Sequence, residues 1–317
     1  MNMLLRLTNS HGSWSSAQTG KGFFVSRLIP ALQEIGVEVT QSLDKQVDID
    51  MHIGKFVYKP KNCKKVILRL GPAHVDKNQD YKKLNERKAE ALKKCDAVIY
   101  QSEFGKKMCD AFLGKKERWA IIGNGARSSD YLDVKKAHSL FRKNILASTR
   151  TWTKQKRLKE IIKSFKLACI GDCCLWIAGD AKGLEKKYDD DSIKFLGSID
   201  QRRLSRYYRM CDVMVSIVYL DCCPNAVAEA ICAGLPVITT DFGGTHEMVR
   251  GVMSTIKDTP WDFKAIDLNK PPKINRFELA DTMRYCTNSK MSVDTRPVDI
   301  RNIAQQYKAF FEEVLDG

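Results

Sequence analysis

The sequence predicts an α/β protein built from two Rossmann-like domains, and three observations support this prediction. The chain has 317 residues, about twice the length of a typical domain. Hydrophobic residues make up 44% of it and charged residues 29%, a globular composition that excludes a disordered or collagenous chain. Short β-branched runs alternate with helical segments, which is typical of βαβ units and parallel sheets.

The first half contains five candidate strands with helical segments between them. The expected strands are residues 3–7, 47–53, 65–70, 97–101 and 119–123. The expected helices are residues 23–35, 81–95 and 103–113. After Gly125 the sequence turns polar, which indicates the end of the first series.

A second, more regular series begins near Asn144. Its expected strands are residues 145–149, 175–179, 194–196, 213–218 and 236–240, and its expected helices are residues 158–168, 203–210 and 225–232. Residues 298–315 carry apolar side chains at helical spacing and predict a final helix. We therefore expect domains over residues 1–143 and 144–297, with residues 298–317 forming a helix that crosses back to the first domain.

Several protein classes are excluded by the distribution of apolar residues and cysteines. No run approaches 18 consecutive apolar residues, which excludes a transmembrane helix, and the first residues are apolar for too short a stretch to form a signal peptide. The 11 cysteines include no Cys-x-x-Cys pair, so their spacing favours neither a zinc site nor a disulfide framework. We expect a cytoplasmic protein with reduced cysteines.

Positive charge is concentrated in one part of the chain. The formal net charge is +15, and residues 55–159 carry 28 Lys and Arg against 10 Asp and Glu. Such a field favours anionic partners. The densest stretch, residues 81–94, is either a solvated helix face or a surface for an anionic membrane or acceptor. Aromatic residues do not interleave with it, so specific nucleic-acid binding is not expected.

Four loops follow predicted strands, where ligands bind in open parallel sheets. They are residues 20–22, 71–76, 150–156 and 221–225. In the last of them, Pro224 is suited to begin a helix whose first N–H groups would favour a phosphate. Glu229 lies about two turns into that apolar helix, where a carboxylate needs either a ligand hydroxyl or a salt-bridge partner.

The segment from Asp221-Cys-Cys-Pro-Asn-Ala-Val-Ala-Glu229 to Gly243-Gly-Thr-His-Glu247, with Ala-Gly-Leu-Pro-Val between its two ends, resembles the nucleotide-sugar motif of the retaining glycosyltransferases of family 4. Agreement continues at residues 95–102, 122–125, 175–179 and 193–197. The resemblance therefore spans nearly the whole chain. It implies the GT-B fold, in which two Rossmann-like domains with parallel sheets face each other across a cleft.

The resemblance implies roles for the charged residues of the last two loops. Arg150 and Lys156 match the basic pair that binds the donor diphosphate, and Glu229 matches the carboxylate that binds the ribose hydroxyls. Asp221 stands at the position of a Glu that contacts the donor sugar near the reacting carbon. Thr153 can instead be aligned with the arginine, in which case Lys154 is the substitute cation.

The resemblance also implies donor and acceptor contacts elsewhere. Backbone groups expected to contact the donor belong to Gly20, Gly22, Gly197, Asn225, Ala226, Gly243 and Gly244. His74, in the first domain, matches a position that contacts the donor sugar, and Asp76 is the competing choice. Arg69 and Asp76 are expected on the acceptor side.

Together these features imply a retaining glycosyltransferase that moves a sugar from a nucleotide diphosphate donor to a hydroxyl of a glycan or glycoconjugate. Fixed cations and a helix N-terminus would meet the leaving diphosphate, so neither a metal nor another cofactor is expected. The acidic clusters at residues 48–50 and 189–191 are interpreted as structural rather than metal-binding. The alternatives are a nucleotide-sugar epimerase or hydrolase of the same fold, and a non-catalytic binding protein that uses the basic face.

Overall fold

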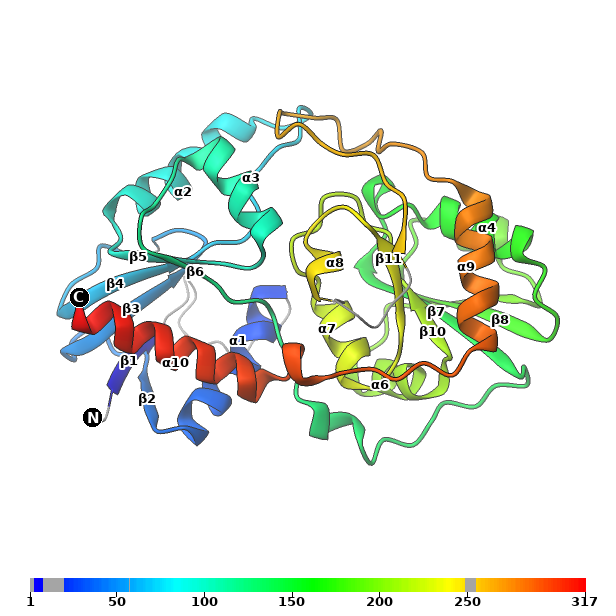
Figure 1. The fold of residues 1–317 in the computed structure, drawn as a ribbon, viewed down its shortest axis with the longest axis horizontal. Coiled ribbons are helices and arrows are strands. Elements are labelled where there is room, and N and C mark those ends of the chain that lie inside the picture. The colour runs from blue at the N-terminus through cyan, green and yellow to red at the C-terminus, as the bar shows by residue number, and fades with distance from the viewer. Residues whose placement is uncertain (1–2, 8–19, 57, 249–254) are drawn as a thin grey trace. The chain divides into compact units, whose positions relative to one another are not determined.

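A computed structural model describes residues 3–7, 20–56, 58–248 and 255–317. The chain divides into two units. Unit 1 comprises Met1–Ala126, Asp262–Ile266 and Pro297–Gly317, and unit 2 comprises Arg127–Trp261 and Asp267–Arg296. Figure 1 shows unit 1 in blue to cyan with the red final helix, and unit 2 in green to orange.

Unit 1 contains a six-stranded sheet in which every described pair of neighbours is parallel. The strand order is β2-β1-β3-β4-β5-β6. The strands are β1 (Met3–Leu7), β2 (Val37–Thr40), β3 (Val47–Ile53), β4 (Cys63–Arg69), β5 (Ala97–Tyr100) and β6 (Trp119–Ile121). The central strands are buried on both faces, as expected for a parallel sheet between helices.

Helices cover both faces of this sheet. They are α1 (Gly20–Glu34), α2 (Tyr81–Lys94), α3 (Glu103–Leu113) and α10 (Ile300–Asp316). The step from β1 to β2 and the step from β4 to β5 run in opposite directions along the sheet, so right-handed crossovers place α1 and α2 on opposite faces. The final helix α10 packs beside α1, and its Tyr307 ring contacts the rings of Phe24 and Phe311 in the core.

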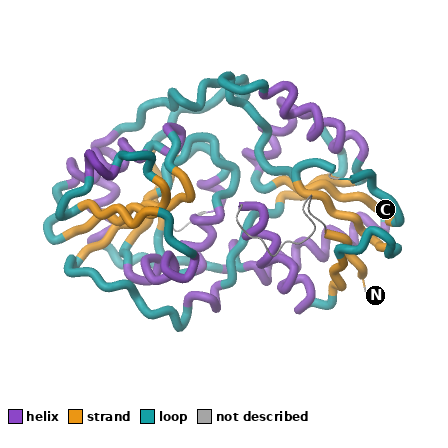
Figure 2. The backbone as a smooth tube through the Cα atoms, turned by 180° about the vertical axis from the view of Figure 1, so that it is seen from behind, coloured by secondary structure: helices purple, strands orange, loops and turns teal. Residues whose placement is uncertain are grey.

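Unit 2 contains a second six-stranded parallel sheet, with the order β12-β11-β10-β7-β8-β9. The strands are β7 (Lys143–Thr151), β8 (Cys173–Asp180), β9 (Ile193–Gly197), β10 (Val213–Val215), β11 (Val237–Thr240) and β12 (Thr255–Ile256). Figure 2 shows the strands of the two units as two separate orange groups, each flanked by purple helices.

The helices of unit 2 again lie on both faces of their sheet. They are α4 (Leu158–Ala168), α5 (Glu185–Tyr188), α6 (Gln201–Met210), α7 (Asn225–Cys232), α8 (Thr245–Met248) and α9 (Arg276–Asn288). Helices α4 and α9 pack together over one hydrophobic core. Since the step from β7 to β8 and the step from β10 to β11 run in opposite directions, right-handed crossovers place α4 and α7 on opposite faces.

The structure confirms the predicted α/β fold with parallel sheets, and the predicted strands and helices are present with small shifts at their ends. Strands β2 and β12 and helices α5, α8 and α9 were not predicted. The division between the units falls after Ala126 rather than near residue 143. The intervening polar segment belongs with unit 2 because the Tyr131 ring packs on Tyr208 and the Ala137 N–H donates to the Arg206 carbonyl. Within the described ranges, no helix is both long and apolar enough to cross a membrane.

Candidate active site

The two sheets each have a topological switch point, where neighbouring strands lead to helices on opposite faces. In unit 2 this point lies between β7 and β10. The loops that follow these strands are joined directly, because the Tyr219 N–H donates to the Gln155 carbonyl at 3.1 Å and Gln155 Nε2 donates to the Tyr219 carbonyl at 2.6 Å. The loop after β11 joins them through the Gly244 N–H, which donates to the Asp221 carbonyl at 2.8 Å. Two of the four predicted loops, together with the predicted Gly243-Gly244 turn, therefore meet at one edge of the sheet.

Helix α7 begins at this edge with Asn225, directly after Pro224. Pro224 provides no side-chain cap for the helix. Within the described part of the chain, the N–H of Ala226 has no acceptor, whereas those of Val227 and Ala228 donate to the Pro224 carbonyl. The start of α7 thus presents an open N–H and the positive end of the helix dipole, which together favour an anion.

Asp221 lies in the loop after β10 and is held by its own turn. Its Oδ1 accepts a hydrogen bond from the Cys223 N–H at 3.1 Å. Burial raises the pKa of the Asp221 carboxyl above its ordinary value, and hydrogen bonds from the Cys223 and Cys222 backbone and the charge of Lys156 oppose this shift without cancelling it. The carboxylate is therefore fixed in place beside a cation.

Lys156 is the predicted cation that lies near Asp221. Its Nζ donates to Thr149 Oγ1 and, at 2.7 Å, to the Thr151 carbonyl, so the side chain is folded back onto the end of β7. Burial lowers the pKa of Lys156, and the charge of Asp221 opposes that shift. Arg150 and Lys154 have exposed side chains on the same loop. The structure thus distinguishes one half-buried cation from two at the surface.

Glu229 is buried in α7, with 5% of its surface exposed. Its Oε2 accepts a hydrogen bond from the Tyr208 hydroxyl at 3.0 Å, and Tyr208 itself is buried in α6. Burial and the neighbouring Glu229 charge raise the pKa of Tyr208 well above its ordinary value, so the phenol stays protonated and remains a donor. Tyr208 was not predicted as a site residue, because its contact with Glu229 joins two helices 21 positions apart.

The three glycines of unit 2 that were predicted to contact the donor have different environments. Gly243 has a φ of +104°, a left-handed backbone conformation that favours glycine, and a Cβ there would lie at ordinary contact distance, 3.4 Å, from the Asp221 carbonyl oxygen. The N–H of Gly244 was expected to contact the donor, but it is already bound to that same carbonyl. Gly197 ends β9, which is separated from β7 by β8, so it lies about 10 Å along the same edge.

Arg157 is a buried residue of the basic loop, and the sequence analysis did not predict a role for it. Its side chain is 1% exposed and makes two hydrogen bonds to Asp258, from Nη1 to Oδ2 at 2.6 Å and from Nη2 to Oδ1 at 2.9 Å. Nη2 also donates to the Pro272 carbonyl. Arg157 has a left-handed backbone conformation, with a φ of +57°, where the short helical turn at residues 154–156 meets α4. This ion pair anchors the loop that carries Lys154 and Lys156.

The switch point of unit 1 lies between β1 and β3. Gly20 opens α1 there, and Gly22 is buried in its first turn. Lys21 lies over the end of β3, because its Nζ is 2.8 Å from the position that a Cβ on Gly54 would take. Burial, together with the charges of Lys55 and Arg69, lowers the pKa of Lys21. Lys21 is thus an exposed cation at the switch point, and the sequence had indicated only its glycine neighbours.

The loop after β4 places His74 and Asp76 at this same edge of unit 1. The backbone N–H and carbonyl of His74 are both bound by the Asn85 side chain, at 2.9 and 2.8 Å. Burial, with the charges of Lys88 and Lys21, lowers the pKa of the imidazole below its ordinary value of 6.5, which favours the neutral ring. Asp76 Oδ1 accepts hydrogen bonds from the N–H and the side chain of Asn78.

Arg69 is buried inside unit 1 and does not reach its surface. It is 2% exposed, and its guanidinium donates to the Tyr307 hydroxyl at 2.5 Å and to Asn124 Oδ1 at 2.6 Å. The guanidinium also lies 4.0 Å from the Phe24 ring centroid. Arg69 is therefore not placed to contact an acceptor, contrary to the prediction, because its guanidinium N–H groups are bound inside unit 1 and hold α10 on the sheet.

The acidic clusters also have structural partners. Asp50 is buried beside Arg6, Asp48 pairs with Lys64, and Asp190 pairs with Lys166. Over the described ranges, no three His, Cys, Asp or Glu side chains gather in a way that could hold a metal ion.

Comparisons with known proteins agree with this architecture. Residues 142–265 match the family model described as glycosyl transferases group 1. No curated protein sequence matches the chain. Among solved structures, sucrose-phosphate synthase from Thermosynechococcus elongatus superimposes with a TM-score of 0.65 at 16% identity, over 99% of this chain and 96% of that chain.

Two further structures are similar over nearly their whole lengths. The glycosyltransferase AviGT4, involved in avilamycin A biosynthesis, has a TM-score of 0.64 at 16% identity and covers 99% of this chain and 98% of its own. HepE from Anabaena, in complex with UDP and glucose, has a TM-score of 0.58 at 14% identity, with coverages of 99% and 98%. The chain therefore has the GT-B fold of these glycosyltransferases, and its residues 142–265 match the model of glycosyl transferases group 1.

Proposed function

We propose that this protein is a retaining glycosyltransferase that moves a sugar from a nucleotide diphosphate donor to a hydroxyl of a glycan or glycoconjugate. The observation that carries the proposal is the switch point of unit 2, where the loop of Lys156 is joined by hydrogen bonds to the segment that carries Asp221, the start of α7 and the buried Glu229. A structural relative, HepE, has been determined with UDP and glucose, which supports a nucleotide-sugar donor.

In this proposal the donor lies along the carboxyl edge of the second sheet. The diphosphate would accept hydrogen bonds from the Ala226 N–H and from Lys156 and Arg150. The Glu229 carboxylate would accept hydrogen bonds from the ribose hydroxyls, with the Tyr208 hydroxyl fixing its position. Asp221 would contact the sugar near its reacting carbon. Lys154 lies on the same loop and would bind the diphosphate in place of Arg150 if Thr153 stands at the arginine position.

The reaction breaks the bond between the anomeric carbon and the diphosphate oxygen and forms a bond from that carbon to the acceptor oxygen. Negative charge grows on the leaving diphosphate, and pre-oriented cations and N–H groups stabilise it without reorganising. The proton of the acceptor hydroxyl passes to the departing phosphate oxygen, so no side-chain base is required. We further propose that the cations and the helix start serve in place of a divalent metal.

The experiment has two stages. Nucleotide sugars are first screened by thermal shift, since a ligand that binds only the folded state raises its apparent stability. The donor with the largest shift is then used in a transfer assay with labelled sugar, in chelator and with added magnesium or manganese at matched ionic strength. We expect a labelled glycan product and equal rates with and without metal.

Each alternative function has its own outcome in this assay. A change in the sugar of the donor without transfer identifies an epimerase, and free sugar without a labelled acceptor identifies a hydrolase. Binding without turnover identifies a binding protein. Transfer that is abolished by chelator and restored by one metal overturns the metal-independent mechanism.

The two carboxylates provide a residue-level test. Glu229→Ala should weaken binding of the nucleotide, because the ribose contact is lost, whereas Asp221→Ala should chiefly lower turnover. If both variants bind and transfer like wild type, the site assignment is wrong.

A further inference from the structure

Unit 2 contains a pocket with a volume of about 420 Å³. Three segments form it: the loop into α4, the residues after β8, and residues 269–273 ahead of α9. Its volume lies in the range of small-molecule sites, about 300–1,000 Å³. Of the predicted donor-binding cations only Lys154 lines it, whereas Lys156 and Asp221 are not among its lining residues.

The pocket is strongly basic. Six of its lining residues are Lys or Arg, and one is acidic: Lys154, Arg157, Lys159, Lys182, Lys270, Lys273 and Glu160. The negative charge of Glu160 is taken up by Arg276, which binds it through Nε and Nη2 at 2.5 and 3.0 Å. An excess of positive charge therefore remains for a ligand.

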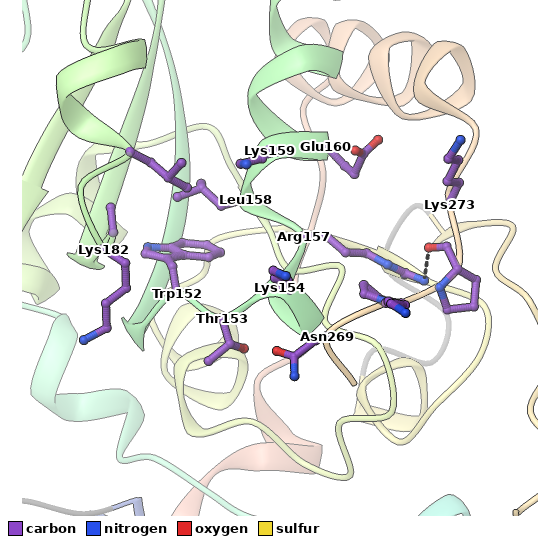
Figure 3. Close-up of a pocket in the computed structure, with 15 residues that line it drawn as sticks. Trp152, Thr153, Lys154, Arg157, Leu158, Lys159, Glu160, Lys182, Asn269 and Lys273 are labelled. Carbon is purple, nitrogen blue, oxygen red and sulfur yellow. Dashed lines mark hydrogen bonds between the residues drawn. The ribbon is translucent and has the colours of Figure 1, made fainter. Parts of the chain in front are cut away.

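Three of the lysines have no carboxylate partner among the residues that the structure describes, namely Lys154, Lys159 and Lys273. Lys182 pairs with Asp180 at the surface, and the Nζ of Lys270 lies 3.8 Å from Oδ2 of Asp267. Figure 3 shows Lys182 and Lys273 at opposite sides of the view, with Lys154 between them. The lysines thus come from all three segments.

Backbone and buried side-chain donors add to this charge. Across the described ranges, the N–H groups of Leu158 and Lys159 at the start of α4 have no acceptor, and neither has the buried Nε of Arg157. The dashed line in Figure 3 is the hydrogen bond that commits the other end of Arg157 to the Pro272 carbonyl. Several donors at one helix start, together with unpaired lysines, are the features of a phosphate site.

The remaining wall of the pocket is apolar and fixed. Trp152 is 5% exposed, and its indole Nε1 donates to the Ala178 carbonyl at 3.1 Å, which holds the ring. Leu158, Ala181 and Pro271 also line the pocket. An inorganic ion alone would leave this wall in water, whereas an organic phosphate would cover it.

We propose that this pocket binds a small organic phosphate, a phosphate monoester on a sugar or a similarly compact carrier, separately from the nucleotide donor. The phosphate lies among Lys159, Lys273 and the start of α4, and the organic part lies against Trp152. The ligand site and the donor site then share the basic loop that carries Lys154 and Lys156.

The test is isothermal titration calorimetry of the full chain with glucose 6-phosphate, glycerol 3-phosphate and phenyl phosphate. Glucose and inorganic phosphate are the reference probes. The double variant Lys159→Gln/Lys273→Gln removes two pocket charges, and Lys186→Gln/Lys290→Gln removes two charges from other exposed positions of unit 2. Circular dichroism establishes that both variants are folded.

We expect at least one monoester to bind wild type more tightly than either reference probe. We expect the pocket variant to weaken that binding about tenfold or more, because it loses two charge-assisted hydrogen bonds to the phosphate. The control variant should bind the monoester as tightly as wild type. Saturating UDP should not compete.

Four results would overturn the proposal: no monoester binding, equal affinity for inorganic phosphate, equal weakening in the control variant, or competition by UDP. If UDP displaces the monoester, the monoester binds at the donor site. If UDP itself does not bind, that result contradicts only the proposed transferase function. The two proposals are therefore tested independently.

Discussion

Replacing Asp258 with Ala removes the partner of the buried Arg157 guanidinium. Both side chains are at most 1% exposed, and the two hydrogen bonds between them are parallel and short. The Pro272 and Ile217 carbonyls accept from Arg157 but carry no net charge, so they do not replace the carboxylate. An Arg157 left buried without a counter-charge destabilises the fold by about 3–5 kcal/mol.

For a unit of this size each kcal/mol lowers the melting temperature by roughly 2–4 °C, so the expected fall is about 6–20 °C. Thermal unfolding followed by tryptophan fluorescence measures it, because Trp152, Trp176 and Trp261 all lie in unit 2. Asp281→Ala is the matched control. It breaks the exposed Asp281–Arg284 pair on α9 and should change stability by at most about 1 kcal/mol.

A melting temperature for Asp258→Ala within the range of the Asp281→Ala control would refute this reasoning. A second readout follows from the position of Arg157, which ties the loop of Lys154 and Lys156 to the segment ahead of α9. Any folded Asp258→Ala protein should therefore also bind a nucleotide diphosphate more weakly than wild type.

Three further predictions concern titration and packing. Asp221→Asn should raise the melting temperature of the ligand-free protein at neutral pH while slowing transfer, because a carboxyl whose folded-state pKa is raised costs stability once it is ionised. Unchanged melting together with wild-type turnover would contradict this prediction. Because the pKa of His74 is lowered in the folded protein, the unfolded chain binds the proton first as the pH falls below 6.5, and the stability of the fold should decrease there. His74→Gln should make the melting temperature less dependent on pH in this range, and an unchanged dependence would contradict the prediction. Deleting residues 298–317 should abolish soluble, active protein, because it uncovers the apolar surface that Ile303, Tyr307 and Phe311 bury, and an active truncation would show that α10 is dispensable.

The fold was predictable where apolar periodicity is strong. Helix α10 carries Ile303, Tyr307, Phe310 and Phe311 on one buried stripe, and its position followed from that spacing. Helix α9 was missed because its buried residues are few and Phe277 and Tyr285 are exposed on it, which obscures the stripe. Periodicity detects a helix only when burial and hydrophobicity coincide.

The site was predictable only as a set of loops. Four basic residues fall within residues 154–159, and the sequence does not indicate which one turns inward. That choice depends on the left-handed backbone at Arg157 and on Asp258, 101 positions away. The role of Tyr208 beside Glu229 depends in the same way on the packing of two helices. Long-range partners of this kind have no local sequence signal.

The central claim is that the carboxyl edge of the second sheet holds a nucleotide diphosphate, with Glu229 on its ribose. Calorimetric titration of wild type and Glu229→Gln with UDP, ADP, GDP and TDP tests it most directly. We predict that at least one of them binds wild type and that Glu229→Gln weakens it by about tenfold or more, while the melting temperature shows that the variant is folded. Failure of all four to bind, or equal affinity for the folded Glu229→Gln protein, would contradict the claim.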